Sequence, residues 1–180
     1  IDESDSTLNV TDEENISVAV NLTNTGEIDL TQNLTASVGG ADQTSQFVPV
    51  DGTNSTTTTL EFPADTDFDG QSVTVASQDD SDTALLEVAE VGELDVSINE
   101  SASNLLVTDE ENVTVVADVE NTGDVSLTQD ITASVGAANP DIVTDLTVAG
   151  GATASVTLEF PADLALDGED VTVASAATTA

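Results

Sequence analysis

An internal repeat constrains the fold of this chain more than any other feature of its sequence. Thr11–Gly39 recurs with mostly conservative differences as Thr108–Gly136, and Thr59–Ser77 recurs as Thr157–Ser175. A repeat on this scale is the signature of a chain built from copies of one structural module. We therefore expect two tandem domains with the same fold rather than one large domain.

The two copies are incomplete at different places. Copy 1 continues through Thr83–Val91, for which copy 2 has no counterpart, and copy 2 is preceded by Leu94–Ser97, for which copy 1 has none. We place the domains at residues 1–91 and 92–180, with the first strand missing from copy 1 and the last strand missing from copy 2. Either the sequence is a window on a longer array, or neighbouring subunits supply the missing strands.

The hydrophobic pattern predicts β-strands along the whole chain. Ile16, Val18, Val20 and Leu22 alternate with polar residues, as in a strand with one buried and one solvated face. Further strand signals fall at 34–38, 47–50, 56–62, 73–75, 85–88 and 94–98. Because short strands recur between turn residues, we expect an all-β chain of two antiparallel, immunoglobulin-like β-sandwiches with about seven strands each. Pro49 indicates an edge strand or a bulge.

The charge of the chain indicates its environment. There is no Lys, Arg or His against 36 Asp and Glu, so the net charge is −36 and no two side chains can form a salt bridge. Mutual repulsion opposes folding in dilute buffer, but at 1 M salt the screening length falls to about 3 Å, so the composition is typical of a halophile. Without cationic side chains, nucleic acid is not expected as a partner. No apolar run of about 18 residues is present, which predicts no transmembrane segment.

Three ordered motifs recur in both copies and point to a family. One strand ends in Asn-Thr-Gly at Asn24–Gly26, a Thr-rich strand after Gly ends in Leu-Glu-Phe at Gly52–Phe62, and Gly precedes a Val-Thr-Val strand at Gly70–Val75. These motifs resemble the CARDB-type, cell-adhesion-related Ig-like modules of archaeal and bacterial surface proteins, and the resemblance covers nearly the whole chain twice. It implies a spacer, stalk or adhesion unit with no catalytic residues. Together with the charge, it suggests a haloarchaeal surface protein.

Asn-x-Ser/Thr sequons are more frequent than chance predicts for this composition. They occur at Asn9, Asn15, Asn21, Asn33, Asn54, Asn99 and Asn112. Asn15 and Asn112 are equivalent in the two copies, which makes them the strongest candidates for N-linked glycosylation and hence for a location outside the cell. The alternative explanation is that polar β-surfaces and turns are simply rich in Asn, Ser and Thr.

A second candidate site is a run of alternate carboxylates. Asp65, Asp67 and Asp69 precede a glycine and resemble the first half of a calcium-binding loop. The position of the closing glutamate in an EF-hand holds Ala76, and copy 2 has Ala165 in place of the middle carboxylate. A turn adapted to high salt explains the same pattern. Apart from calcium and glycans, no cofactor is expected.

We expect the protein to act without catalysis. Lacking His, Cys and Lys, the chain could offer only carboxylates and hydroxyls as bases or nucleophiles, and no carboxylate pair stands out. The incomplete copies favour a repeating subunit or stalk segment of an extracellular filament, sheath or surface layer of a halophilic archaeon. Strand addition between copies would then build a homopolymer, and other surface glycoproteins are further candidate partners. The alternative is the stalk of an adhesin or cell-surface binding protein whose recognition domain lies elsewhere.

Overall fold

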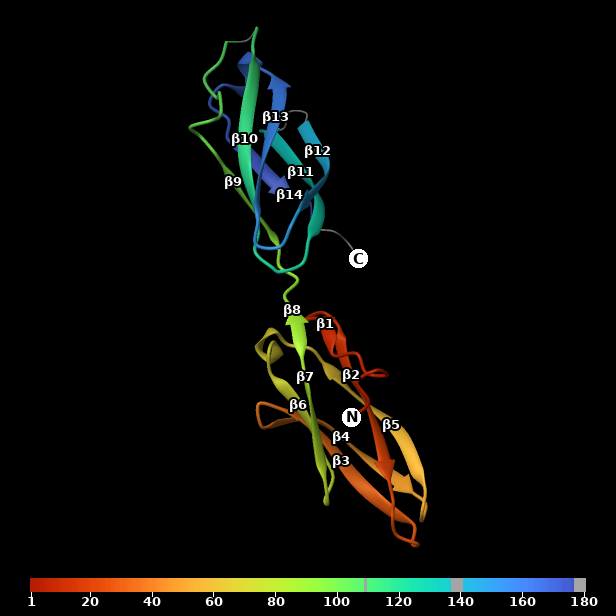
Figure 1. The fold of residues 1–180 in the computed structure, drawn as a ribbon. Coiled ribbons are helices and arrows are strands. Elements are labelled where there is room, and N and C mark those ends of the chain that lie inside the picture. The colour runs from red at the N-terminus through yellow and green to blue at the C-terminus, as the bar shows by residue number, and fades with distance from the viewer. Residues whose placement is uncertain (109, 137–140, 177–180) are drawn as a thin grey trace. The chain divides into compact units, whose positions relative to one another are not determined.

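The computed structural model describes residues 1–108, 110–136 and 141–176 (Figure 1). The chain divides into two compact units, Ile1–Val91 and Gly92–Ala180, which we call unit 1 and unit 2. The described residues form β-strands and two short 3-10 turns, with no α-helix among them. Within these residues, no helix is long and apolar enough to span a membrane.

Unit 1 is an antiparallel β-sandwich with one added parallel pair. Its elements are β1 (Asn9–Thr11), β2 (Asn15–Thr23), β3 (Leu30–Val38), β4 (Ala41–Val50), β5 (Ser55–Pro63), η1 (Thr66–Phe68), β6 (Ser72–Ala76), β7 (Ser81–Leu85) and β8 (Glu87–Ala89). Strand β2 pairs with β5 in one sheet, and the other sheet has the order β4-β3-β6-β7. Strand β1 pairs in parallel with β8.

The core of unit 1 follows from the alternation in the sequence. Side chains two residues apart point to the same face of a strand, so β2 buries Ile16, Val18 and Val20 while β3 buries Leu34 and Ala36. Residues of both sheets belong to one hydrophobic cluster, and the two sheets therefore pack face to face as in an immunoglobulin-like sandwich.

Unit 2 repeats this architecture with a different set of outer strands. Its elements are β9 (Leu94–Ile98), β10 (Asn112–Asn121), β11 (Leu127–Val135), β12 (Asp141–Val148), β13 (Thr153–Pro161), η2 (Leu164–Leu166) and β14 (Val171–Ser175). The sheets have the orders β13-β10-β9 and β12-β11-β14. Val115, Ala117, Val119, Ile131 and Ala133 are fully buried between them. The antiparallel sandwich predicted for the second copy is confirmed.

The strand count differs from about seven per copy, because the described residues give eight strands in unit 1 and six in unit 2. The strand expected at 85–88 is divided between β7 and β8, with Leu86 fully buried between them. Strand β4 begins at Ala41, earlier than the strand expected at 47–50. Its first residues are polar, so no hydrophobic alternation marked them as strand in the sequence. Pro49 lies in β4, an edge strand of its sheet, as predicted.

The repeated Asn-Thr-Gly motif forms a hydrogen-bonded turn after the first long strand of each copy. In unit 1, Asn24 Nδ2 donates to Ile28 O at 2.8 Å and to Val50 O at 3.2 Å, while Gly26 N donates to Asn24 Oδ1 at 2.9 Å. Asn121 makes the same three hydrogen bonds in unit 2. These two side chains are the only buried polar ones among the described residues. The motif therefore ties one sheet to the other.

Candidate functional site

The two units differ at the outer edge of their first long strand. In unit 2, β9 pairs antiparallel with β10, with Leu94 opposite Asn121 and Ile98 opposite Ala117 (Figure 1). The equivalent edge of unit 1 is Val20–Thr23 of β2 together with the following Asn24, and no described strand pairs with it. The candidate site lies along this edge.

The first residues of the chain occupy only the end of the position that β9 fills in unit 2. Asp2 N donates to Ala19 O at 2.8 Å, as its counterpart Asn99 N donates to the equivalent carbonyl of Val116 at 2.8 Å. Ile1 therefore stands where Ile98 stands in unit 2. No described residue of unit 1 lies at the positions of Leu94–Ser97.

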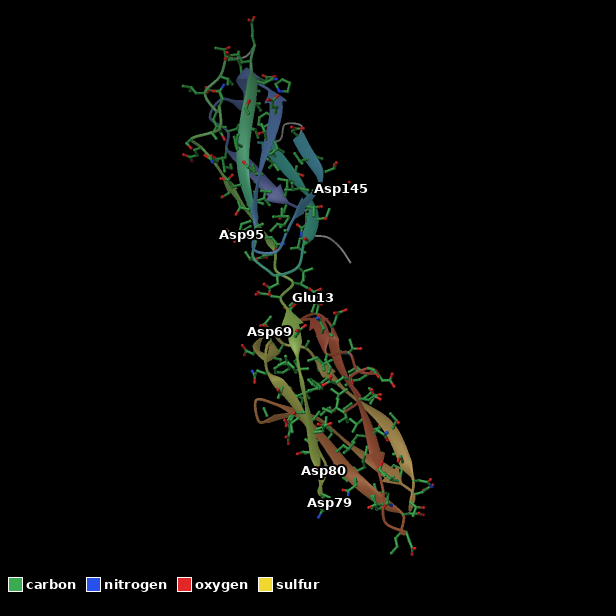
Figure 2. All side chains as sticks on the ribbon, viewed as in Figure 1. Glu13, Asp69, Asp79, Asp80, Asp95 and Asp145 are labelled. Carbon is green, nitrogen blue, oxygen red and sulfur yellow. The ribbon has the colours of Figure 1, made fainter. Side chains whose placement is uncertain are left out.

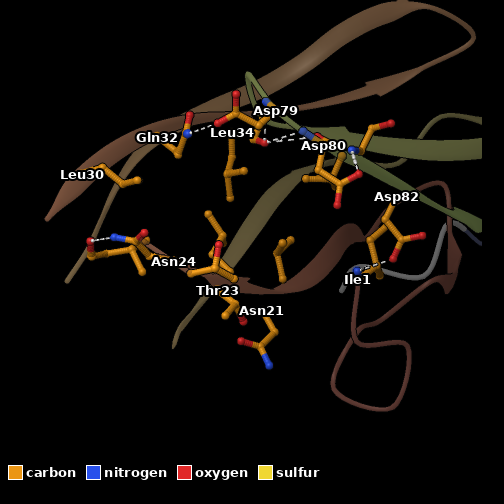
Figure 3. Close-up of a pocket in the computed structure, with 17 residues that line it drawn as sticks. Ile1, Asn21, Thr23, Asn24, Leu30, Gln32, Leu34, Asp79, Asp80 and Asp82 are labelled. Atoms are coloured by element: carbon orange, nitrogen blue, oxygen red, sulfur yellow. Dashed lines mark hydrogen bonds and ion pairs between the residues drawn. The ribbon is translucent and has the colours of Figure 1, made fainter. Parts of the chain in front are cut away.

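A groove of about 560 Å³ lies in the space left open, and we call it the β2 groove. Figure 3 shows the edge of β2 on one side, with Asn21 and Thr23, and the turn after β6 on the other, with Asp79 and Asp80. Apolar side chains also line it, namely Ile1, Val20, Leu22, Leu30, Leu34, Val50 and Val75. The groove therefore has apolar walls beside an unpaired strand edge.

Burial in the two units shows what the groove lacks. Leu22 is half-buried, whereas its counterpart Val119 is fully buried beneath β9. Leu30 is 37% exposed, whereas Leu127 is half-buried and packs against the core of unit 2. In unit 2, Leu94 of β9 is only 6% exposed and belongs to the hydrophobic cluster that contains Val119 and against which Leu127 packs. The unit with a strand at the β9 position is thus the one in which these side chains are less exposed.

Unit 2 has its own uncovered edge, on β14. The equivalent strand β6 of unit 1 pairs with β7, and its Val73 and Val75 are 0% and 3% exposed. Their counterparts Val171 and Val173 are only half-buried, and no described strand pairs with the outer edge of β14. Among the described residues, each unit therefore has an unpaired strand edge at a place where the other unit has a strand.

Carboxylates form one rim of the β2 groove. The amino terminus at Ile1 donates to Asp82 Oδ2 at 2.6 Å, and this hydrogen bond with the cation lowers the pKa of the Asp82 carboxyl. Gln32 Nε2 donates to Asp79 Oδ2 at 2.8 Å, which links β3 to the turn after β6 (Figure 3). The rim is thus ordered and negatively charged, so an occupant with acidic residues is repelled unless salt screens the charges.

The structure places the predicted glycosylation sites at accessible positions. One of the seven asparagines, Asn99, is half-buried. The other six are exposed, namely Asn9, Asn15, Asn21, Asn33, Asn54 and Asn112. Asn15 and Asn112 are the first residues of β2 and β10. Asn99 is the least available, because Nδ2 donates to Asp118 Oδ2 at 3.2 Å and Oδ1 accepts from Ser101 Oγ at 2.8 Å. Glycosylation itself stays a prediction.

The carboxylates of the calcium prediction have structural roles around η1. Asp65 Oδ1 caps this turn by accepting from Asp67 N at 2.9 Å, and Asp163 Oδ1 accepts from Ala165 N at 2.9 Å in the equivalent turn. Asp69 Oδ1 accepts from Val88 N at 3.0 Å and so ties η1 to β8. Across the described residues, no three acidic side chains gather into a group that could hold a metal ion. The structure therefore does not bring the three candidates together, and calcium binding stays a prediction.

The repeat in the sequence predicted the unpaired edge of copy 1 but not the opposite wall of the groove. Leu30, Gln32 and the turn Asp79–Asp82 come from segments distant from β2, and no local pattern connects them to it. The repeat contains one signal for this wall. Leu30 of copy 1 aligns with Leu127 of copy 2, so the two side chains are expected at equivalent positions of their units.

Comparison with protein-family models gave no match, and comparison with curated proteins gave none either. Among solved structures, the chain is similar to red sea bream transglutaminase, with a TM-score of 0.31 and 16% sequence identity. The similarity covers 84% of this chain and 25% of the transglutaminase chain. At this level it carries no argument about activity.

Proposed function

We propose that this chain is a non-enzymatic extracellular structural protein of a halophilic archaeon. Its role would be that of a repeating subunit or stalk segment in a surface filament, sheath or surface layer. The observation that carries this proposal is the repeated β-sandwich, in which each unit has an apolar core and no described carboxylate is buried.

One segment of the chain fills both kinds of edge. Its first part, β7, pairs with β6 of unit 1, and its second part, β9, pairs with β10 of unit 2. A segment of the same pattern placed between unit 2 of one copy and unit 1 of the next would complete both open edges in the same way. Contacts of this kind join unlike surfaces, so they build a ring when the rotation between copies closes and a fibre when it does not; we propose the fibre. Unpaired edges left uncovered invite uncontrolled pairing.

The surface charge supports a location in high salt outside the cell. Figure 2 labels Glu13, Asp69, Asp79, Asp80, Asp95 and Asp145, and all six side chains are exposed. No carboxylate among the described residues is buried. A surface of this kind keeps its hydration and its solubility at molar salt, where the repulsion between its charges is screened. Accessible sequons at Asn15 and Asn112 agree with a surface glycoprotein.

The chemistry of the side chains supports a role without catalysis. The chain has no His, Cys or Lys, and its carboxylates lie at the surface, where water weakens their interactions. The groove walls are an apolar strip and a strand edge, which suit a polypeptide better than a small substrate.

A second candidate is the stalk of an adhesin or cell-surface binding protein. The observation that favours it is that a β9-type strand belongs to the same chain as the unit it completes. In a longer array, each preceding module would complete the next one, and the recognition domain would lie beyond the stalk.

The proposal is tested by electron microscopy of native material purified and kept in molar salt. The subunit proposal predicts fibres or sheets whose axial repeat corresponds to two sandwiches. Monodisperse particles that remain unassembled over a wide concentration range would refute it and leave the stalk as the better account.

A further inference from the structure

We infer that Asn33 carries an N-linked glycan whose first sugar stacks on the ring of Phe47. Asn33 lies in β3 and Phe47 in β4, and these strands pair at one edge of the four-stranded sheet (Figure 1). The inference rests on the extracellular location in the proposed function. It deepens that proposal by naming one modified residue and the side chain that holds the sugar.

Phe47 differs from the other aromatic residues of the chain in its exposure. Phe62 and Phe160 are buried and Phe68 is half-buried, whereas Phe47 is 73% exposed. The chain has no Trp and no Tyr, so Phe47 is its one aromatic side chain that lies mainly in water. The next residue, Val48, points into the core, and Phe47 therefore points outward. Its ring presents an open apolar face above the sheet.

The register of the sheet places a sequon directly opposite this ring. Asn33 is the partner of Phe47 in the antiparallel ladder of β3 and β4. Residues directly opposite each other on one face have Cβ atoms about 4.5–5.5 Å apart. Asn33 is exposed, and Thr35, which completes the sequon, lies on the same face two residues further on. The acceptor amide and the ring therefore lie side by side on the outer face.

The other sequon asparagines that lie in paired strands have no aromatic partner. In their registers, the residues opposite Asn9, Asn15, Asn21 and Asn112 are Glu87, Pro63, Thr57 and Pro161. The amide of Asn9 is also engaged, because its Nδ2 donates to Glu87 Oε2 at 2.7 Å. Asn33 is thus the sequon at which a stacked sugar is expected.

The second copy of the repeat lacks both the asparagine and the ring. Asp130 stands at the position of Asn33, and Asp145 stands at that of Phe47. Asp145 N donates to Asp130 Oδ1 at 2.8 Å, and the register of β11 on β12 shifts at this point. A carboxylate cannot form the N-glycosidic bond, and an aspartate offers no ring to a sugar. The joint change is expected if the two residues act together.

The surface around Phe47 suits a carbohydrate. The C–H groups on one face of a sugar ring carry a partial positive charge, which the negative face of an aromatic ring attracts. The outward residues of β3 and β4 around Phe47 include no carboxylate, and they are Thr31, Asn33, Thr35, Ser45 and Pro49. A sugar attached to Asn33 therefore meets an apolar ring and neutral side chains.

The attachment is a glycosyl transfer from an activated donor. Asn33 Nδ2 attacks the anomeric carbon of a glycosyl phosphate held by a separate glycosyltransferase. The new bond joins nitrogen to the anomeric carbon, and the bond from that carbon to the phosphate oxygen breaks. The phosphate leaves with the bonding electrons, and Nδ2 loses one proton to a base of the transferase.

Mass spectrometry of native protein tests whether Asn33 is modified. Because the chain has no Lys or Arg, the protease must cleave after acidic residues. Such cleavage releases the peptide 30–42, in which Asn33 is the only sequon. We expect this peptide to carry the mass of a glycan. An unmodified Asn33 beside other occupied sequons would overturn the inference and leave the extracellular location standing.

Nuclear magnetic resonance of the glycosylated full chain in molar salt tests the stacking. The ring current of Phe47 should shift the protons of the first sugar upfield. Phe47→Leu keeps an apolar side chain but removes the ring, and it should abolish the shift. Leu85→Ala removes another exposed apolar side chain from the same sheet and should leave the shift unchanged.

Thermal unfolding measures the contribution of the sugar to stability. In glycosylated protein, Asn33→Gln should lower the melting temperature of unit 1 by about 2–8 °C, the effect of one aromatic contact in a domain of this size. In protein already carrying Phe47→Leu, the same substitution should have no further effect. Asn33→Gln should also have no effect in protein made without glycosylation, which separates the sugar from the asparagine itself.

Sugar protons that keep their shifts in Phe47→Leu, or substitutions whose effects on the melting temperature simply add, would overturn the inference. These results are independent of microscopy on native material. A glycan stacked on Phe47 in protein that forms no fibres would leave this inference and remove the subunit role. Fibres in which Asn33 is unmodified would do the reverse.

Discussion

Replacing Thr53 with glycine should stabilise unit 1, and the two copies of the repeat provide the reason. Thr53 has a φ of 59°, and its counterpart Gly151 has a φ of 64°. Both backbone amides donate to the carbonyl of the Asn-Thr-Gly turn, Thr53 N to Gly26 O at 2.7 Å and Gly151 N to Gly123 O at 2.8 Å. The same turn is thus made with glycine in one unit and with a β-branched residue in the other.

The expected magnitude is a small difference between two opposing terms. The left-handed conformation costs a residue with a Cβ about 1–2 kcal/mol. Glycine loses more conformational entropy than threonine on folding, and this loss offsets about 0.5–1 kcal/mol of the gain in stability. Because the Thr53 side chain is exposed, its removal loses little packing. Thr53→Gly should therefore gain about 0.5–1 kcal/mol, which raises the melting temperature of a domain of this size by about 2–8 °C.

Thermal unfolding followed by circular dichroism in molar salt measures this effect, with Gly151→Thr as the reciprocal variant. A Cβ at Gly151 meets nothing within 4 Å, so any loss of stability there comes from the backbone conformation rather than from a clash. Thr53→Gly should raise the transition of unit 1 and Gly151→Thr should lower that of unit 2. A lower midpoint for Thr53→Gly, or a higher one for Gly151→Thr, would refute the reasoning.

Three further predictions concern the turns and the charge. Asn121→Ala removes three hydrogen bonds from a fully buried position and should cost about 3 kcal/mol in urea unfolding, at about 1 kcal/mol for each bond. Hydrogen bonds from Thr108 lower the pKa of Glu111, so its contribution is present above the ordinary glutamate pKa and is lost as the pH falls through the lowered value. Glu111→Gln should therefore flatten the acid limb of the stability curve, and an unchanged limb would contradict this. Dialysis from molar to low salt should remove the β-sheet signal, because the charge of −36 is then unscreened, whereas a retained signal without divalent cations would exclude the halophile account.

The sequence was sufficient for the sandwich because its core strands alternate cleanly. Ile16, Val18 and Val20 alternate with polar residues, and all three are buried as predicted. The repeat added what periodicity cannot supply, since Leu94–Ser97 has no counterpart in copy 1 of this sequence and β2 is unpaired at this place.

Features that depend on long-range pairing were not predictable. Strand β1 is only three residues long, and its parallel pairing with β8 depends on two segments far apart in the chain. Ala19 lies on the polar face of β2 yet is buried, because Asp2 and Ser6 from the chain start cover it through hydrogen bonds. The three carboxylates at 65–69 look like ligands in sequence, but two of them accept hydrogen bonds from backbone amides instead.

The most direct test of the account is a cryo-electron microscopy reconstruction of the native assembly in molar salt. We predict that an extended strand pairs antiparallel with β2 along Asn21–Thr23, with apolar side chains inside the groove. We also predict that the outer edge of β14 is paired with a strand. A reconstruction in which assembled subunits leave the edge of β2 open to solvent would contradict the account.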